Sequence, residues 1–141
     1  MIEKKDFDYF NYGKIENEKF WRRIGHKPDL QNKTVLDFGC GHGALCINLA
    51  ESGATKIKGI DLNEKLLKFA NENLQQNYKE YQSKVDFQKQ DLLDENFNEK
   101  FDLIVTKDTF EHSLNLPEIL NKFYKILAKG GKVYAGFGPL Y

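Results

Sequence analysis

The stretch VLDFGCGHG, residues 35–43, decides the fold because it runs from an apolar segment directly into three alternating glycines. Residues 34–38 predict a short buried strand, and residues 44–51 predict a buried helix. A tight turn between the two needs one glycine or two. Three glycines at alternate positions indicate a loop whose backbone approaches a ligand closely and takes positive φ angles.

After this loop, strands and helices alternate along the chain. Apolar segments predict four further strands, at residues 56–60, 85–90, 101–106 and 132–137. Strands that alternate with helices at this spacing are typical of an α/β protein with a doubly wound parallel sheet. Ligands bind to such sheets at the carboxyl ends of the strands, so the residues that follow each strand are the candidates for function.

Two helices are predicted between the later strands. The first spans residues 64–78, and the second runs from Pro117, which suits a first helical turn, to residue 127. The residues expected to face the core are Leu67, Ala70 and Leu74 in the first helix and Leu120, Phe123 and Leu127 in the second.

The composition argues against several classes of protein. Lys and Arg total 21 and Asp and Glu total 21, so the formal net charge is zero, whereas nucleic-acid-binding modules usually carry a basic excess. No apolar run approaches the roughly 18 residues of a membrane span, so no membrane partner is expected. The spacing of Cys40 and Cys46 is neither that of a metal pair nor that of a redox motif. We therefore expect no metal, and free thiols in a reducing cytoplasm.

Carboxylates lie at or just after the first four predicted strands. They are Asp37, Asp61, Asp91, Asp108 and Glu111. The loop alone leaves the ligand open, since Gly39, Gly41 and Ala44 also satisfy the dinucleotide-binding pattern GxGxx(G/A). A carboxylate beneath the glycines would repel a pyrophosphate. The acids therefore favour a ligand that carries positive charge.

Two of these acids suggest contacts with a nucleoside. Asp61 can accept hydrogen bonds from both hydroxyls of a ribose, each contributing about 1.5–3 kcal/mol. Its alternative role is to cap the helix at residues 64–78, although Asn63 is available for that. Asp91 can accept from an adenine amino group while the backbone N–H of Leu92 meets a ring nitrogen, and its alternative is a solvated loop acid.

Together these segments resemble the motifs of class I methyltransferases over roughly residues 30–137. VLDFGCGHG resembles the first motif, Asp61 resembles the ribose-binding acid, and Asp91-Leu92 resembles the adenine-contacting pair. FDLIVTKDTFEH, residues 101–112, followed by Pro117, resembles the fourth-strand motif common in small-molecule methyltransferases. LAKGG, residues 127–131, resembles the turn before the fifth strand, with Lys129 where proline is usual.

The resemblance implies a Rossmann-like methyltransferase fold with strand order 3-2-1-4-5 and the cofactor S-adenosyl-L-methionine. This cofactor carries a sulfonium and an ammonium against one carboxylate, so its net charge is positive. By resemblance, Asp37 lies near the methionine ammonium, and Lys107 offers its backbone carbonyl to the same group while its side chain points elsewhere. The other residues expected at the cofactor are Phe38, Gly39, Cys40, Gly41, Gly43 and Leu62.

The implied activity is methyl transfer to a small-molecule acceptor, with oxygen ahead of nitrogen or carbon as the methylated atom. Residues 106–109 read TKDT and not the (N/D)PP(Y/F) run of enzymes that methylate base amino groups in DNA, so no nucleic-acid substrate is expected. His112 is the one candidate for acid–base catalysis, with a structural role as the alternative. His42 is expected to make a local hydrogen bond.

Two other classes of function stay open. One is a non-catalytic cofactor-binding or scaffold protein that has the same fold. The other is an NAD-dependent oxidoreductase, which would have to tolerate Asp37 beneath the loop, and the sequence shows no catalytic Tyr-x-x-x-Lys pattern for it.

Residues 1–30 are predicted to form a helical arm or lid that precedes the methyltransferase domain at residues 31–141. One apolar helix stripe, ending near Gly25 and Pro28, is expected to contain Ile15, Phe20, Trp21 and Ile24. The aromatic residues of the arm either close over the cofactor or acceptor or simply cover the sheet; they are Tyr9, Phe10, Tyr12 and Trp21.

The expected strand at residues 132–137 would lie at an edge of the sheet. Class I methyltransferase sheets normally have seven strands, and the last two would follow this one. We therefore hypothesise that the domain is C-terminally incomplete, or that the edge pairs with another chain in self-association.

Overall fold

The computed structural model describes residues 2–107 and 115–136, and its centre is a parallel sheet of five strands. The strand order is β3-β2-β1-β4-β5, and all four pairings are parallel, which confirms the predicted doubly wound topology. The strands are β1 (Thr34–Phe38), β2 (Lys56–Asp61), β3 (Val85–Lys89), β4 (Phe101–Lys107) and β5 (Leu127–Gly136). In this order β1 is central, so the loop that follows β1 lies in the middle of the carboxyl edge.

Helices cover both faces of the sheet because neighbouring residues of each strand point to opposite sides. On β1, Val35 belongs to a core cluster shared with helices α1, α2 and α3, and Leu36 belongs to a second cluster packed under α4. The helices are α1 (Lys4–Ile24), α2 (Ala44–Glu51), α3 (Glu64–Asn77) and α4 (Leu116–Ile126), with a short 3₁₀ turn at Lys79–Tyr81. No helix within the described residues is long and apolar enough to cross a membrane.

The junction between α4 and β5 differs from the prediction. The helix ends at Ile126, and Leu127 already pairs with Phe101 as the first residue of β5. The two glycines at 130 and 131 therefore lie inside the strand, where the register with β4 shifts, and do not follow a helix end. The inward residues of α4 are Ile119, Phe123 and Ile126, so Phe123 is confirmed, whereas Leu120 is 47% exposed.

Helix α1 is longer than the predicted stripe, and three of the four stripe residues pack into the core: Phe20 and Trp21 are buried, and Ile24 is partly buried. Its buried residues are Phe10, Asn17, Phe20 and Trp21. Ile15 is 63% exposed, so its expected place in the stripe is wrong. Six residues of helix rotate by about 600°, which places Ile15 well away from the side of Trp21. Gly25, with φ of 122°, ends the helix as predicted.

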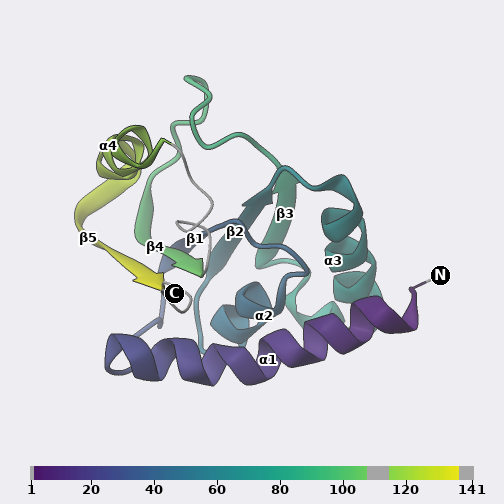
Figure 1. Cartoon of the computed structure of the whole chain (residues 1–141). Coiled ribbons are helices and arrows are strands. Elements are labelled where there is room, and N and C mark those ends of the chain that lie inside the picture. Colours follow the sequence, from purple (N-terminus) through teal and green to yellow (C-terminus); the bar gives the residue numbers. More distant parts are fainter. Residues whose placement is uncertain (1, 108–114, 137–141) are drawn as a thin grey trace, which may run out of the picture.

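Helix α1 lies below α2 (Figure 1) and packs into the core cluster that α2 and α3 share. The indole Nε1 of Trp21 donates to Asn48 Oδ1 of α2 at 2.9 Å, and its ring lies 6.4 Å from that of Tyr134 in β5. At Gly13 an added Cβ would lie 3.0 Å from the Cβ of Ala44, so the glycine allows α1 to approach α2 closely. The predicted arm is thus packed onto the domain.

Replacing Trp21 by alanine tests how firmly α1 is attached. We expect Trp21→Ala to lower the free energy of unfolding by about 3–5 kcal/mol, because a buried indole and its hydrogen bond are lost. The matched control is Ile15→Ala on the same helix, where exposure predicts a change within about 0.5 kcal/mol. Urea unfolding of both variants measures the difference, and equal losses would contradict the proposed packing.

Candidate active site

The loop after β1 holds the three glycines in conformations that other residues rarely adopt. Gly39, Gly41 and Gly43 have φ angles of 78°, 53° and 91°. The N–H groups of Gly39 and Cys40 donate to Ile60 O of β2 at 2.9 and 3.0 Å, which fastens the start of the loop to the sheet. At Gly43 an added Cβ would meet the Phe87 ring at 2.6 Å, so this position has no room for a side chain.

Asp37 lies beneath this loop on β1 and is only 2% exposed. Its Oδ2 accepts a hydrogen bond from the Sγ of Cys46 at 3.3 Å. Burial raises the pKa of Asp37 to about 7, and the opposing effects of the Cys46 hydrogen bond and the positive charge of Lys107 are smaller. Burial also raises the pKa of the Cys46 thiol well above its usual range, so the thiol keeps the proton that it donates.

Asp61 ends β2 and holds the glycine loop against the next loop along the edge. Its Oδ2 accepts from Gly41 N, and its Oδ1 accepts from Asn63 N, both at 2.9 Å. The side chain of Asn63 caps α3 by accepting from the N–H groups of Lys65 and Leu66. Asp61 is therefore not needed as the cap, which was the alternative that the sequence left open.

Asp91 follows β3 and begins a loop that is packed against the sheet. Its Oδ1 accepts from Leu93 N at 2.9 Å, and its carbonyl accepts from Asp94 N at 3.2 Å. The Leu92 side chain is buried in the cluster under α4. With its side chain in the core, Leu92 can meet a ligand mainly through its backbone.

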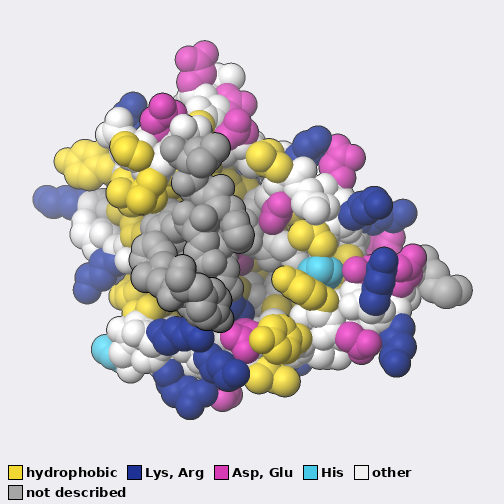
Figure 2. Space-filling model, in the orientation of Figure 1, with side chains coloured by type: hydrophobic (Ala, Val, Ile, Leu, Met, Phe, Trp, Pro, Cys, Tyr) yellow, Lys and Arg dark blue, Asp and Glu magenta, His cyan; other side chains and the backbone are white. Residues whose placement is uncertain are grey.

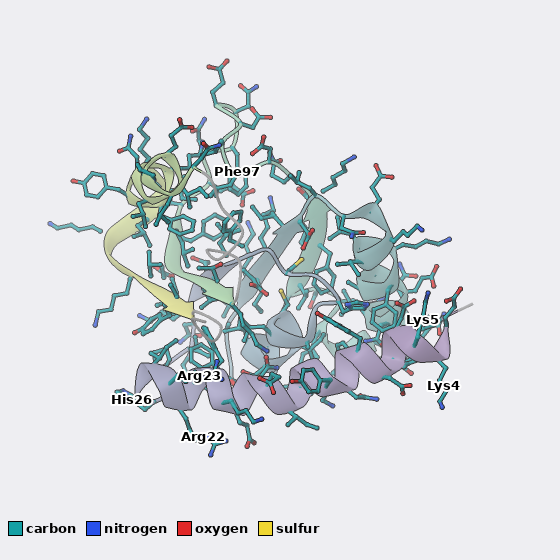
Figure 3. All side chains as sticks on the ribbon, in the orientation of Figure 1. Lys4, Lys5, Arg22, Arg23, His26 and Phe97 are labelled. Carbon is teal, nitrogen blue, oxygen red and sulfur yellow. The ribbon has the colours of Figure 1, made fainter. Side chains whose placement is uncertain are left out.

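The same loop is anchored at Phe97 between two lysines. The Nζ atoms of Lys58 and Lys122 lie 5.7 and 5.9 Å from the centre of the buried Phe97 ring, within the range of cation–π attraction. Lys58 also pairs with Glu99, and Lys122 donates to Asp94 O at 2.8 Å. Phe97, which is labelled in Figure 3, thus joins the loop to β2 and α4.

Two adjacent cavities lie along this edge and share four lining residues. The first, of about 480 Å³, is lined by Asp61, Leu62, Asp91, Leu92 and Phe38 among others, and we call it the nucleoside cavity after the contacts predicted for Asp61 and Asp91. The α1 cavity, of about 590 Å³, is lined by Asp37, Cys40, His42 and one face of α1. The shared residues are Tyr9, Gly39, Gly41 and Lys107.

Most of the predicted site residues line one or both cavities. Gly43 is the exception, because it is packed against Phe87 and lines neither. Lys107 also differs from the prediction. It lines both cavities, and its positive charge lowers the pKa of both Asp37 and Glu16, so its charge acts on this end of the site. Cys40 is buried, and burial raises the pKa of its thiol, so it is not a reactive thiolate.

His42 connects the glycine loop with α1, which is a longer-range contact than the local hydrogen bond that was predicted. Its Nε2 lies 3.3 Å from Oδ1 of Asp6, and its ring lies 4.5 Å from the ring of Tyr9 and 5.1 Å from that of Phe69. His112, Asp108 and Glu111 lie outside the described residues.

Sequence reasoning missed the polar wall that α1 contributes to the α1 cavity. These residues are Gly13, Glu16, Asn17, Lys19 and Arg23. Most of them are the charged and polar types expected on any solvated helix face. The one available signal was that Gly13 and Glu16 each lie four residues after a predicted aromatic residue, Tyr9 or Tyr12, and that Lys19 and Arg23 follow Glu16 at intervals of three and four residues.

The fold and this edge define the class of protein, a doubly wound domain with two adjacent cavities along one edge of its sheet, and comparison with known proteins identifies the family. Residues 29–136 match the model of a family described as "Methyltransferase domain", and the chain belongs to it. S-adenosylmethionine is the cofactor of this family.

Curated relatives act on different acceptors, as their names state. The chain is 32% identical to phosphoethanolamine N-methyltransferase 2 of Caenorhabditis elegans, covering 86% of this chain and 27% of the relative. It is 30% identical to the ubiquinone biosynthesis O-methyltransferase of Pseudomonas entomophila, covering 79% and 47%. It is 42% identical to the ribosomal protein L11 methyltransferase of Dictyoglomus turgidum, covering 58% and 26%. The chain therefore spans less than half the length of each of these relatives.

Solved structures share the fold. A putative S-adenosylmethionine-dependent methyltransferase from Methanococcus maripaludis superposes with a TM-score of 0.72 at 21% identity, covering 98% of this chain and 66% of that one. Phosphoethanolamine N-methyltransferase 2 of Haemonchus contortus, solved in complex with S-adenosylhomocysteine, superposes with a TM-score of 0.71 at 26% identity, covering 84% and 27%.

The raised pKa of Asp37 predicts that cofactor binding depends on pH. A ligand ammonium near Asp37 stabilises the ionised carboxylate, so binding should release a proton where Asp37 is protonated in the free protein. The affinity for S-adenosylhomocysteine should then rise with pH up to about 7, by at most about tenfold per pH unit. Calorimetry between pH 5.5 and 7.5 measures this.

The control variant for this prediction is Asp37→Asn, which has no proton to lose at this position. It should bind more weakly at pH 7.5 and show a flat profile over the same range. A wild-type profile that is equally flat would show that Asp37 does not face the ligand ammonium.

Proposed function

We propose that this chain is the cofactor-binding part of an S-adenosylmethionine-dependent methyltransferase that acts on a small-molecule acceptor. The observation that carries the proposal is the buried carboxylate of Asp37 beneath three glycines of positive φ, beside the α1 cavity. The resemblance of the fourth-strand segment to small-molecule methyltransferases supports the acceptor class, and it makes oxygen the first methylated atom to test.

The residues present fit this cofactor at three points. Asp37 would meet the methionine ammonium, because a carboxylate out of contact with water gains most from a cationic partner. Asp61 would hold the ribose hydroxyls; its two oxygens accept one hydrogen bond each from the chain and keep further lone pairs. Asp91 and the backbone of Leu92 would meet the adenine, and both residues line the nucleoside cavity.

When bound, the cofactor supplies a methyl group that its sulfonium already activates. The chain has to bind and orient the two reactants, and this alignment is itself a large part of catalysis. The glycine loop positions the cofactor from below, and α1 closes the α1 cavity along one side. Asp37 also disfavours a pyrophosphate at the loop, which separates this proposal from a dinucleotide-dependent oxidoreductase.

Ligand binding tests the proposal directly. S-adenosylmethionine and S-adenosylhomocysteine should bind to the chain, and NAD should not, because its diphosphate would lie close to Asp37. Isothermal titration calorimetry with each ligand is the measurement. Tighter binding of NAD than of the methyl donor would refute the assignment.

The role of Asp61 is tested by two substitutions. Asp61→Ala should weaken binding of S-adenosylhomocysteine by about 1.5–3 kcal/mol, the scale of lost hydrogen bonds to a charged group. Asp61→Asn keeps one oxygen acceptor for the Gly41 and Asn63 N–H groups, so its melting temperature should stay nearer to wild type while its affinity still falls. If both variants lose stability but keep their affinity, Asp61 serves only to order the two loops.

A further inference from the structure

We infer that the part of the α1 cavity beyond Asp37 binds an anionic group, a carboxylate or phosphate, carried by the methyl acceptor. This inference rests on the proposed function, since it assumes that the methyl donor occupies the Asp37 end. The wall opposite the glycine loop is one face of α1, formed by residues that recur every three or four positions: Tyr9, Tyr12, Glu16, Lys19 and Arg23.

Positive charge exceeds negative charge along this wall. Lys19 and Arg23 of α1 and Lys107 at the end of β4 all line the cavity. Glu16 is the one carboxylate among the cavity-lining residues of α1 and lies 3.3 Å from Nζ of Lys19, so it offsets Lys19 and leaves the charge of Arg23. Burial raises the pKa of Glu16, but hydrogen bonds from Lys19 and Tyr12 and the charges of Lys19 and Lys107 outweigh it, so Glu16 is ionised. A ligand with negative charge is therefore favoured.

A buried polar atom on the same wall also indicates a ligand. Asn17 lines the cavity, is 2% exposed, and donates its Nδ2 to Ala44 O of α2 at 3.1 Å. Its Oδ1 is buried and has no hydrogen-bond partner among the described residues. An acceptor oxygen in this position suits a ligand that presents a hydroxyl or amine as well as its anionic group.

The length of the wall indicates that this anion belongs to the acceptor and not to the methyl donor. Tyr9 lines both cavities and so marks the border with the nucleoside cavity. Lys19 lies ten residues farther along α1 and Arg23 fourteen, or about 15 and 21 Å at the rise of an α-helix. The donor carboxylate is on the same carbon as the ammonium assigned to Asp37, so we assign the acceptor's anion to the far end of the wall, at Arg23 and Lys19.

The neighbouring residue Arg22 provides a matched control for Arg23. Both are exposed arginines on α1, but only Arg23 lines the cavity. Figure 3 shows Arg23 on the side of α1 that faces the sheet and Arg22 on the opposite side. Basic side chains gather over this end of α1 in the space-filling view (Figure 2). If positive charge on α1 acted non-specifically, substitution of Arg22 and substitution of Arg23 would therefore lower anion affinity to a similar degree.

The experiment measures binding of small anions to the 141-residue chain saturated with S-adenosylhomocysteine. The probes are inorganic phosphate and acetate, with neutral acetamide as the comparison, followed by NMR titration at low ionic strength. Phosphate and acetate should bind and acetamide should not, and added NaCl should weaken the binding. The double variant Lys19→Met with Arg23→Met should lose about tenfold or more in phosphate affinity, as expected for lost charge-assisted hydrogen bonds.

The controls separate this inference from the proposed function. Arg22→Met should match wild type, Arg23→Lys should retain phosphate binding, and the double variant should bind S-adenosylhomocysteine as wild type does. Unchanged phosphate binding in the double variant, or no anion binding by wild type, overturns the inference and leaves the proposed function standing. A loss of S-adenosylhomocysteine affinity in the double variant assigns the cations to the donor carboxylate and also overturns it. A wild-type chain that does not bind S-adenosylhomocysteine refutes the proposed function itself.

Discussion

Asp37 lies in the central strand of the sheet with its carboxylate almost removed from water, and a charge in that position is costly unless something compensates it. Among the described residues, Asp37 gains a hydrogen bond from the Cys46 thiol and the favourable charge of Lys107, and burial outweighs both. A fold that needed only a stable strand at this position would be served better by an apolar residue. The charge of Asp37 is thus incompletely compensated, as expected if a cationic ligand pairs with it. The glycine loop above Asp37 lets such a ligand approach closely.

The attachment of α1 and the shape of the glycine loop depend on each other. Asp6 and Tyr9 of α1 contact His42 inside the loop, and Asn17 of α1 holds the carbonyl of Ala44 where α2 begins. A shift of α1 would therefore disturb the loop that holds the proposed cofactor. On the other side of the site, Phe97 and the two lysines around it hold the loop that carries Asp91. Both ends of the cleft are thus braced by contacts between residues far apart in the sequence.

The sequence was sufficient for the features that depend on local pattern. The strands around the glycine loop were predicted to within a residue. A short apolar run bounded by glycines or acids is compatible with few secondary structures other than a strand. The stripe of α1 was partly wrong because several faces of a long helix can collect apolar residues, and only packing against α2 and β5 decides between them. The start of β5 was predicted five residues too late, at residue 132 and not at Leu127, because a glycine pair is equally compatible with a turn and with a strand irregularity.

The candidate site likewise has one part that the sequence predicts and another that depends on packing. Asp37, Asp61 and Asp91 could be predicted because the topology places the ends of parallel strands at one edge. The α1 wall could not, because Glu16, Lys19 and Arg23 become part of a cavity only through the way α1 lies against that edge. This difference has a physical consequence for specificity. The residues proposed for the cofactor come from the strand ends and the loops that follow them, whose positions the sheet determines, whereas those proposed for the acceptor come from a helix docked by side-chain contacts. Under the proposed assignment, a change in the surface of α1 alters the choice of acceptor while the residues at the strand ends that would hold the cofactor stay in place.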